Sequence, residues 1–406
     1  MADLEYLEIG SAAKPVAQGR SLVTSSRYQS LCWQWVKKDK GPRTNAPFVL
    51  MDWKPGQDEH LTATHKMQGP LPLKSLPEEV TLTGNPRGFP LDGISVSRHR
   101  YMNNYTTNEL EQRVVQENLN KIGKPLLETW AGIIRDVVFF HSLSLGRENL
   151  VQTSSDLNWT SLRSLDTFRE NANQPDIGTS DAATAYKKYN VVFADSTGGL
   201  VSTAGGDTWT NMGSGNRLTI ASLRRAKLRA RMRGVQPLML KVNGSLKQTY
   251  IIVLEDYGIA ELREDDEFNA ALLNAEVRGA KNPYWNGWGP TYVLDGMLIY
   301  SATCSRDGDD TYLTNQTVLR SEEIAGTSLA KFEGHIIGDR CLVVDDWRSP
   351  RYSTKELDHD GMQTQSALRF HIGAAKIPNV LEDSTADTQS FRERSMSLCY
   401  VADKEQ

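Results

Sequence analysis

Residues 250–302 read YIIVLEDYGIAELREDDEFNAALLNAEVRGAKNPYWNGWGPTYVLDGMLIYSA. The run 250–254 is apolar and rich in β-branched residues, which predicts a buried strand. Across 255–276, apolar residues recur every three or four positions, which predicts a helix. The run 292–300 has Asp295-Gly296 at its centre and predicts a hairpin. The stretch therefore combines strand, helix and hairpin, and it holds almost none of the chemistry that an active site needs.

Other motifs lie before and after this stretch at characteristic intervals. Inside the stretch, the motif residues are Tyr257, Leu262-Arg263, Arg278-Gly279, Asn282-Pro283, Gly289 and Gly296. Before it lie 216–220, 223–227, Pro237 and Val242-Asn243-Gly244, and nearer the N-terminus lie 81–85, Ile94, Val96 and Gln112-Arg113. Near the end of the chain, Ala367-Leu368 and Gly373-Ala374-Ala375 are predicted to form a late strand and turn. Their shared order resembles one family, the major capsid proteins of tailed bacteriophages, in the branch typified by large virulent podoviruses.

This resemblance implies an α+β fold, the major capsid fold that tailed phages share with herpesviruses. The expected parts are an N-terminal arm (1–46), an extended β-hairpin loop (47–92), a peripheral domain with a long spine helix (93–150), an axial domain (151–344) with a surface insertion near 303–340, and a C-terminal segment (345–406) that returns through both domains.

The resemblance also implies a structural function. Hexamers and pentamers of the chain are expected to form an icosahedral shell around the double-stranded DNA of a tailed phage, without sequence-specific binding. Expected partners are further copies of the chain, the portal, and scaffold, protease or decoration proteins. We expect assembly in the bacterial cytoplasm, a place in the virion, and no membrane contact, enzymatic activity or cofactor.

Composition agrees with such a function and excludes some others. The 406 residues are 39% hydrophobic and 24% charged, and the net charge is −4. A protein whose main task is gripping nucleic acid is expected to be strongly basic, so this balance argues against that class. The four cysteines lack CxxC spacing, which indicates free thiols. The N-terminus resembles no signal peptide, and no apolar run reaches the ~18 residues of a membrane span.

Two further segments bear on the architecture. Apolar residues step by three and four from Val115 to Phe140, which predicts a long helix. Pro125 predicts a kink, or a short helix next to a longer one that starts near this residue. Taken alone, the helix also suits the core of any large globular protein. Strand-like runs at 48–51 and 80–83 enclose a polar loop, which predicts a two-stranded excursion that needs a neighbour to stabilise it.

Tests for chemical motifs assign no catalytic, cofactor-binding or metal-ligating residue. Phosphate-loop, dinucleotide, HExxH and GxSxG patterns are absent from the sequence. Gly213-Ser214-Gly215 before a helix favours a turn over an anion site, and 307–310 lacks the glutamate that a calcium loop needs. His359 between two aspartates has no nucleophile that can be named as its partner. The basic run 224–233 favours pairing with acids across a contact over nucleic-acid binding.

Two other function classes stay open at this point. One is a polysaccharide- or nucleotide-acting enzyme with a site formed by Trp285, Trp288 and the acidic run of Asp307, Asp309 and Asp310. For the tryptophans, the glycines and prolines around them favour a packed corner at a subunit contact. The other is a phage tail or decoration protein, which forms rings or tubes instead of closed shells.

Overall fold

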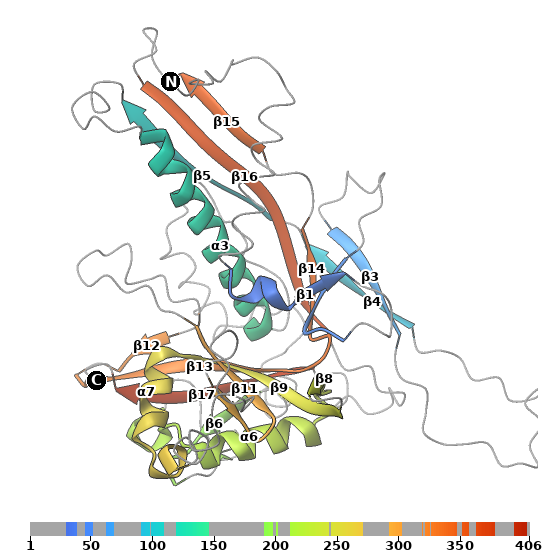
Figure 1. The fold of residues 1–406 in the computed structure, drawn as a ribbon, viewed down its shortest axis with the longest axis vertical. Helices are drawn as coiled ribbons and strands as arrows, with labels where there is room; N and C mark the ends of the chain where they lie inside the picture. The colour runs from blue at the N-terminus through green and yellow to red at the C-terminus, as the bar shows by residue number, and fades with distance from the viewer. Residues whose placement is uncertain are drawn as a thin grey trace, which may run out of the picture.

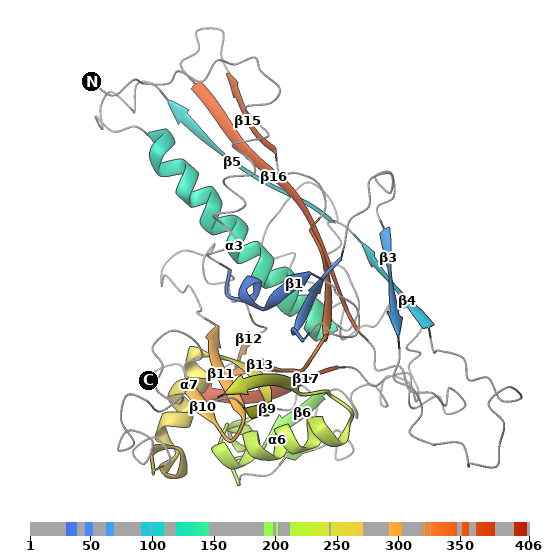
Figure 2. The same ribbon diagram turned by 45° about the vertical axis from the view of Figure 1, so that its right-hand side comes forward.

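The computed structural model describes residues 30–38, 45–51, 62–68, 91–97, 99–108, 119–145, 191–197, 200–201, 212–242, 245–270, 292–302, 319, 321–324, 326–346, 351–356, 363–377 and 394–403. Figures 1 and 2 show an elongated arrangement with a sheet and a long helix in its upper part and a second, larger sheet below. Helices and strands are mixed, so the predicted α+β class is confirmed.

Among the described residues, six strands form the first sheet. Its order is β1-β2-β14-β16-β15, and β5 also pairs with β16. The bounds are β1 (Val36–Lys38), β2 (Phe48–Leu50), β5 (His99–Asn108), β14 (Leu342–Asp345), β15 (Arg351–Glu356) and β16 (Gln363–Lys376). The helix α3 (Leu119–Leu145) runs beside β5 and β16 (Figure 1), and buries Phe139, Phe140 and Leu143 in a core shared with Phe48 and Phe370.

Nine described strands form the second sheet. Its order is β10-β11-β9-β13-β17-β6-β7, with β12 on β13 and β8 on β9. The bounds are β6 (Val191–Ala194), β7 (Leu200–Val201), β8 (Leu238–Val242), β9 (Ser245–Glu255), β10 (Tyr292–Leu294), β11 (Met297–Ala302), β12 (Ser321–Glu323), β13 (Leu329–Ile337) and β17 (Ser395–Asp403). The helices α6 (Ile220–Met232) and α7 (Asp256–Glu264) pack on this sheet, α6 below it and α7 at its left-hand end in Figures 1 and 2, and the short 3-10 helix η5 (Ser214–Asn216) precedes α6.

The two faces of the second sheet belong to different cores. Along β9, Ile251 and Val253 join the core that contains α3, whereas Ile252 and Leu254 join the core beneath α6 and α7. This alternation follows from the two-residue period of a strand. An uninterrupted apolar run such as 250–254 is therefore explained by burial on both faces.

Most elements predicted around this run are confirmed. The strand predicted at 250–254 is part of β9. Asp295 and Gly296 have φ values of 47° and 74°, as the predicted hairpin turn between β10 and β11 requires.

The helix predicted over 255–276 is interrupted. The helix α7 ends at Glu264, Asp265 is extended, and a new helical turn starts at Asp266. The Asp265 side chain accepts the Glu267 N–H at 3.0 Å, so this residue caps the second helix instead of continuing the first. Residues 271–276 lie outside the described part of the chain.

Two other corrections concern strands. The expected surface insertion near 303–340 is wrong for β13, which is a buried central strand from Ala330 to Ile337. Its polar residues Lys331, Glu333 and His335 alternate with apolar ones, which is typical of a strand with one exposed face, yet they are buried as well, so the sequence does not indicate a central strand. The turn expected at 373–375 is also wrong, because these residues continue β16 to Lys376 and pair with β14.

The predicted long helix is present as one element. Since α3 continues from Leu119 through Pro125 to Leu145, the two-helix alternative is wrong. Pro125 lies in the second turn, where its missing N–H removes one hydrogen bond while the later turns stay packed. At Gly123 a Cβ would lie 2.5 Å from the Tyr105 ring, so glycine permits the close approach of α3 to β5. Residues 115–118 lie outside the described part.

A third, two-stranded sheet pairs β3 (Thr62–Gln68) with β4 (Leu91–Ser97). Val96 packs with Val343, Ala375 and Ile377, which places the base of this ladder on the first sheet. The predicted excursion exists, but its strands differ from those expected. The run 48–51 contains β2, which belongs to the first sheet, while 80–83 lies outside the described residues. The ladder also extends beyond the expected boundary at residue 92.

A four-residue junction, 338–341, connects β13 of the second sheet directly to β14 of the first. Its backbone N–H groups donate to three carbonyls elsewhere in the chain: Asp339 to Gln236 at 2.7 Å, Arg340 to Ala46 at 2.9 Å and Cys341 to Pro47 at 2.8 Å. The Cys341 carbonyl accepts the Ile377 N–H at 2.8 Å. We call residues 338–341 the inter-sheet junction, because segments leading into β2, β8 and β17 meet there.

Gly338 allows this convergence. A Cβ at this position would lie 2.4 Å from the Gln236 carbonyl oxygen and 2.7 Å from Val235 Cγ1. We predict that Gly338→Ala lowers the free energy of unfolding by about 1–3 kcal/mol, because backbone has to move to admit the methyl group. Urea denaturation measures the change. Gly215→Ala is the matched control, since its Cβ has no atom within 4 Å; equal stability of the two variants would contradict the prediction.

Candidate functional site

The described polar clusters hold chain segments together. In the first, Asp136 of α3 accepts hydrogen bonds from the Ser30 hydroxyl at 2.5 Å and from the backbone N–H groups of Leu31 and Cys32, both at 2.9 Å. Burial raises the pKa of Asp136, and these hydrogen bonds offset the rise only in part. The carboxyl group thus ties the segment before the 3-10 helix η1 (Cys32–Trp35) to α3.

Arg135, the residue before Asp136, also holds this segment. We call Arg135 and Asp136, with their contacts to residues 30–33, the α3 anchor. Arg135 is fully buried, and its guanidinium lies 5.6 Å from the ring centre of Trp33 and 4.9 Å from that of Phe370. Trp33 also stacks on Phe139 at 6.4 Å. The tryptophan therefore packs on α3 of its own chain and shares a cation–π contact with it.

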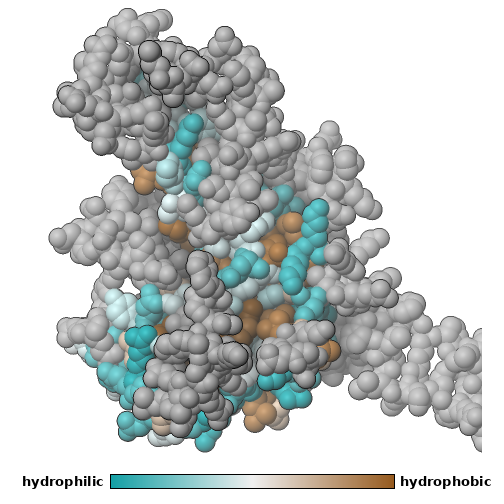
Figure 3. Space-filling view, in the orientation of Figure 1, coloured by the Kyte–Doolittle hydropathy of each residue, from teal (hydrophilic) through white to brown (hydrophobic). Residues whose placement is uncertain are grey.

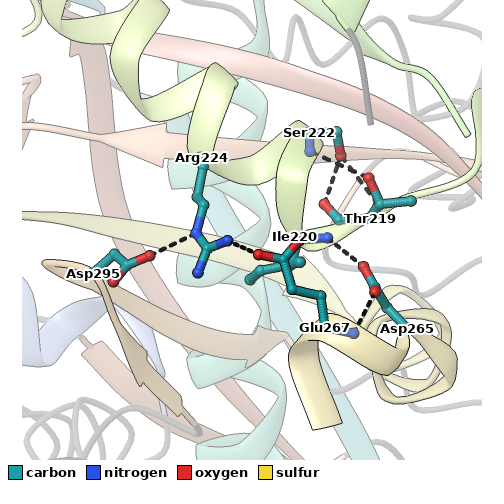
Figure 4. A network of polar contacts seen from close by, with 7 residues as sticks. All are labelled: Thr219, Ile220, Ser222, Arg224, Asp265, Glu267 and Asp295. Atoms are coloured by element: carbon teal, nitrogen blue, oxygen red, sulfur yellow. Dashed lines mark hydrogen bonds and ion pairs between the residues drawn. The ribbon is translucent and has the colours of Figure 1, made fainter. Parts of the chain in front are cut away.

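A second cluster caps α6 (Figure 4). Thr219 and Ser222 form a reciprocal capping box at 3.1 and 3.2 Å. Asp265 accepts the Ile220 N–H at 2.8 Å with one oxygen and the Glu267 N–H at 3.0 Å with the other. One carboxylate therefore caps two helices, and it occupies the α6 N-terminus where a free anion would otherwise be attracted.

Arg224 extends this cluster to the hairpin. Its Nε donates to Asp295 at 2.6 Å, and its Nη1 pairs with Glu267. Lys227 donates to the Asp295 carbonyl. The hydrogen bond that Arg224 donates to Asp295 is the main reason that the pKa of Arg224 is raised. The expectation that the basic run pairs with acids is confirmed for Arg224; such exposed pairs contribute about 0–1 kcal/mol each.

Glu255 lies in a different environment, at the end of β9. It is fully buried, and its backbone N–H donates to the Tyr400 hydroxyl at 2.9 Å. Burial raises the pKa of its carboxyl group to about 8, and the neighbouring Asp256 charge adds to the rise. Backbone N–H groups of Asp256 and Leu319 offset this in part. The Glu255 carboxyl is therefore mostly protonated at neutral pH.

The remaining sequence candidates fall into two groups. The turn at 213–215 closes on itself, because the Gly213 N–H donates to Asn216 Oδ1 at 3.1 Å, so the turn interpretation is confirmed. The tryptophan corner, the acidic run 307–310 and His359 lie outside the described residues. Cys32, Cys341 and Cys399 form no disulfide, as predicted, and all three are buried, whereas Cys304 is not described. Burial raises the pKa of Cys32 and Cys341, which keeps these thiols protonated.

The described residues show little that suits chemistry. Within the described ranges, no group of three His, Cys, Asp or Glu side chains is placed to hold a metal ion. None of the helices described has the length and apolar character that a membrane crossing requires. The clusters that sequence reasoning missed, at Asp136, Asp265 and Glu255, are structural. Asp265 gave a usable signal, since aspartate is a preferred N-cap residue.

Comparison with known proteins identifies the architecture. No family model and no curated protein matches the sequence. Solved structures do match. The capsid of Ralstonia phage GP4 has a TM-score of 0.60 at 14% identity, over 92% of this chain and 90% of that one. The cyanophage Pam1 capsid asymmetric unit has 0.59 at 12%, over 94% and 93%. The head of Helicobacter pylori bacteriophage KHP40 has 0.54 at 14%, over 91% and 90%.

This chain has a phage-capsid fold. The resemblance predicted from the sequence motifs is thereby confirmed at the level of the fold. The phage-capsid fold accounts for the division into a first sheet with α3 and a second sheet with α6 and α7. In such a fold the outer surfaces matter more than pockets, and the polar clusters described above hold the segments that form these surfaces in place.

The α3 anchor generates the next prediction. Asp136→Ala leaves the Ser30 hydroxyl and two backbone N–H groups without their buried acceptor, so we expect unfolding to become easier by about 1–3 kcal/mol. Urea denaturation measures the loss, and hydrogen exchange should show faster exchange at Leu31 and Cys32. Asp136→Asn should be intermediate, since its single amide oxygen can keep the bonds from Ser30 and Cys32 that one carboxylate oxygen accepts but not the bond from Leu31 to the other. Unchanged protection of both amides in the alanine variant would refute this role.

Glu255 gives a pH-dependent prediction. Because its folded-state pKa of about 8 exceeds the unfolded value of 4.5, the folded chain binds more protons between these values and its stability falls as pH rises. The slope approaches about 1.4 kcal/mol per pH unit for this group. Glu255→Gln removes the titration, so the variant should gain stability relative to the wild type from pH 5 to 8. Urea titrations at each pH test this, and parallel stability curves would show that Glu255 is ionised when folded.

Proposed function

We propose that this chain is the major capsid protein of a tailed phage, assembling as hexamers and pentamers into an icosahedral shell around double-stranded DNA. The observation that carries the proposal is the likeness to phage capsid structures across about nine tenths of both chains. A match of that extent covers the whole architecture and is not confined to one common motif.

The β3–β4 ladder supports a role in assembly. It forms a sheet of its own and lies beside the first sheet in Figures 1 and 2. A two-stranded sheet is marginal in water without a packed face. Its base packs on the first sheet through Val96. We propose that the chain from the end of β2 to the end of β4, residues 51–97, forms the extended loop and that the rest of this ladder is covered by a neighbouring subunit.

The other parts are proposed on the same basis. Residues 1–46 act as the N-terminal arm, the first sheet with α3 forms the peripheral domain, and the second sheet forms most of the axial domain. The C-terminal segment returns through both, since β16 lies in the first sheet and β17 in the second. The protein is structural and non-enzymatic.

Assembly rests on repetition of contacts. Each contact between copies is weak, and closure of a symmetric shell adds many of them. Partners at other positions of the shell are the portal and scaffold, protease or decoration proteins. The mature protein lies in the virion after assembly in the bacterial cytoplasm.

The proposal predicts that the purified full chain associates into pentamers, hexamers or closed shells. Analytical ultracentrifugation measures the oligomers, and negative-stain microscopy shows their form. A chain that stays monomeric at high concentration contradicts the proposal, and open rings or tubes indicate a tail protein instead. Deletion of residues 52–90 is a matched control, because it removes β3, and with it the β3–β4 ladder, while leaving every strand of the two large sheets; the variant should stay folded and lose assembly.

A further inference from the structure

The outer face of α6 carries apolar side chains that the fold does not use. The helix buries Leu223, Ala226 and Ala230 against the second sheet. On the opposite side, at helical spacing, lie Leu228 and Met232, which are 57% and 76% exposed. Figure 3 shows hydrophobic surface at the lower edge of the molecule, where Figure 1 places α6.

Basic side chains surround this apolar pair. Arg225 and Arg231 are exposed and Arg229 is half-buried. In the described part of the chain these three arginines form no ion pair, in contrast to Arg224. We define the α6 outer face as Arg225, Leu228, Arg229 and Met232; Arg231, two turns after Arg224, lies on the same side of the helix as that residue. Its apolar centre and arginine-rich border match the composition of a protein interface.

The same chain presents a complementary surface. Glu264, Asp266 and Glu267, at the end of α7 and the start of the next helix, are all exposed. Glu267 pairs with Arg224, whereas Arg225 and Arg229 lie about 100–140° further round α6 and form no ion pair with these acids in the described part of the chain. On one molecule the basic face and the acidic surface are therefore not paired with each other, and a contact between two copies can bring them together.

We propose that the α6 outer face docks against the acidic surface, Glu264 and Asp266 above all, of a second copy of this chain. Two different surfaces on each molecule give a head-to-tail contact, and such contacts close into rings when the rotation permits. This inference rests on the proposed function and names one contact within the ring.

Duplex DNA is the other chemistry that arginines could serve. The phosphate backbone is bound through charge, and the exposed Leu228 and Met232 would add nothing to such binding. Their burial is favourable only against another apolar or mixed surface, at roughly 25 cal/mol per Å². A protein partner therefore explains both the charged and the apolar members of the face.

Charge reversal tests the contact. Arg225→Glu with Arg229→Glu places acids opposite acids, and Glu264→Lys with Asp266→Lys places bases opposite bases. Each double variant should weaken association on the order of tenfold or more, since like charges across an interface cost several kcal/mol. The charge-preserving control, Arg225→Lys with Arg229→Lys, should assemble. Thermal melting confirms that each variant is folded.

Rescue separates a direct contact from a structural effect. The chain with all four reversed charges should regain association. An equimolar mixture of the two double variants should also associate, but only into rings with an even number of subunits, because the variants have to alternate. Sedimentation should therefore show hexamers without pentamers. Failure of both rescues overturns the proposal.

The wild type distinguishes the two levels of the argument. If the wild type assembles and both double variants assemble equally well, the α6 contact is wrong while the capsid function stands. If the wild type stays monomeric, both fail. Fluorescence anisotropy with a short duplex DNA covers the remaining occupant: loss of DNA binding in the arginine variant with intact assembly would assign the face to DNA and overturn the contact.

Discussion

The inter-sheet junction is the constraint on which the rest of the structure depends. Only residues 338–341 separate a central strand of the second sheet from β14 of the first. Their backbone groups hydrogen-bond to the segments that lead into β2 and β8 and to the end of β16. Arg340 adopts φ 51° there, a conformation that non-glycine residues rarely take. The backbone groups of the junction are hydrogen-bonded to segments next to β2, β8 and β16, which belong to the two sheets. If one sheet shifted alone, some of these hydrogen bonds would break.

The second sheet is central for a related reason. Its two faces contribute to separate cores, and the α3-side face carries buried polar residues among the apolar ones, including His335, whose ring stacks on Phe140 at 5.6 Å. Buried polar groups are costly unless they are hydrogen-bonded or paired, and they then specify one arrangement. Combined with the contacts of Arg135 and Asp136, this arrangement fixes the C-terminal half of α3 relative to the sheets. The helix is thus a strut between the first sheet and the second.

How far the sequence predicts this structure depends on where each signal lies. The helix α3 and the Asp295-Gly296 hairpin are encoded locally, by periodicity and by turn chemistry, and both are present. The strand β13 is not encoded in this way, because its burial on both faces comes from neighbours far away in the sequence. The break at Asp265 is likewise decided by a tertiary contact: its carboxylate also caps α6, some 45 residues earlier. The anchor at Asp136 depends on a segment 104–106 residues away. The capsid architecture was nonetheless identifiable, because the order of motifs is preserved even where single elements are ambiguous.

The proposed shell, built from weak contacts, needs subunits that are already rigid before they assemble. If the two sheets moved freely, each new contact would have to cover the entropy of ordering them, and repetition would gain little. Because of the inter-sheet junction and the double cap at Asp265, the two sheets are already ordered in the folded chain, so assembly contacts do not have to supply the entropy of ordering them. The junction and the cap also hold α6 and the acidic residues after α7 at fixed positions, since Asp265 bonds to the first turn of both helices. The surfaces proposed to meet between copies are therefore set by the same carboxylate, which makes their spacing a property of the fold and not of the assembly.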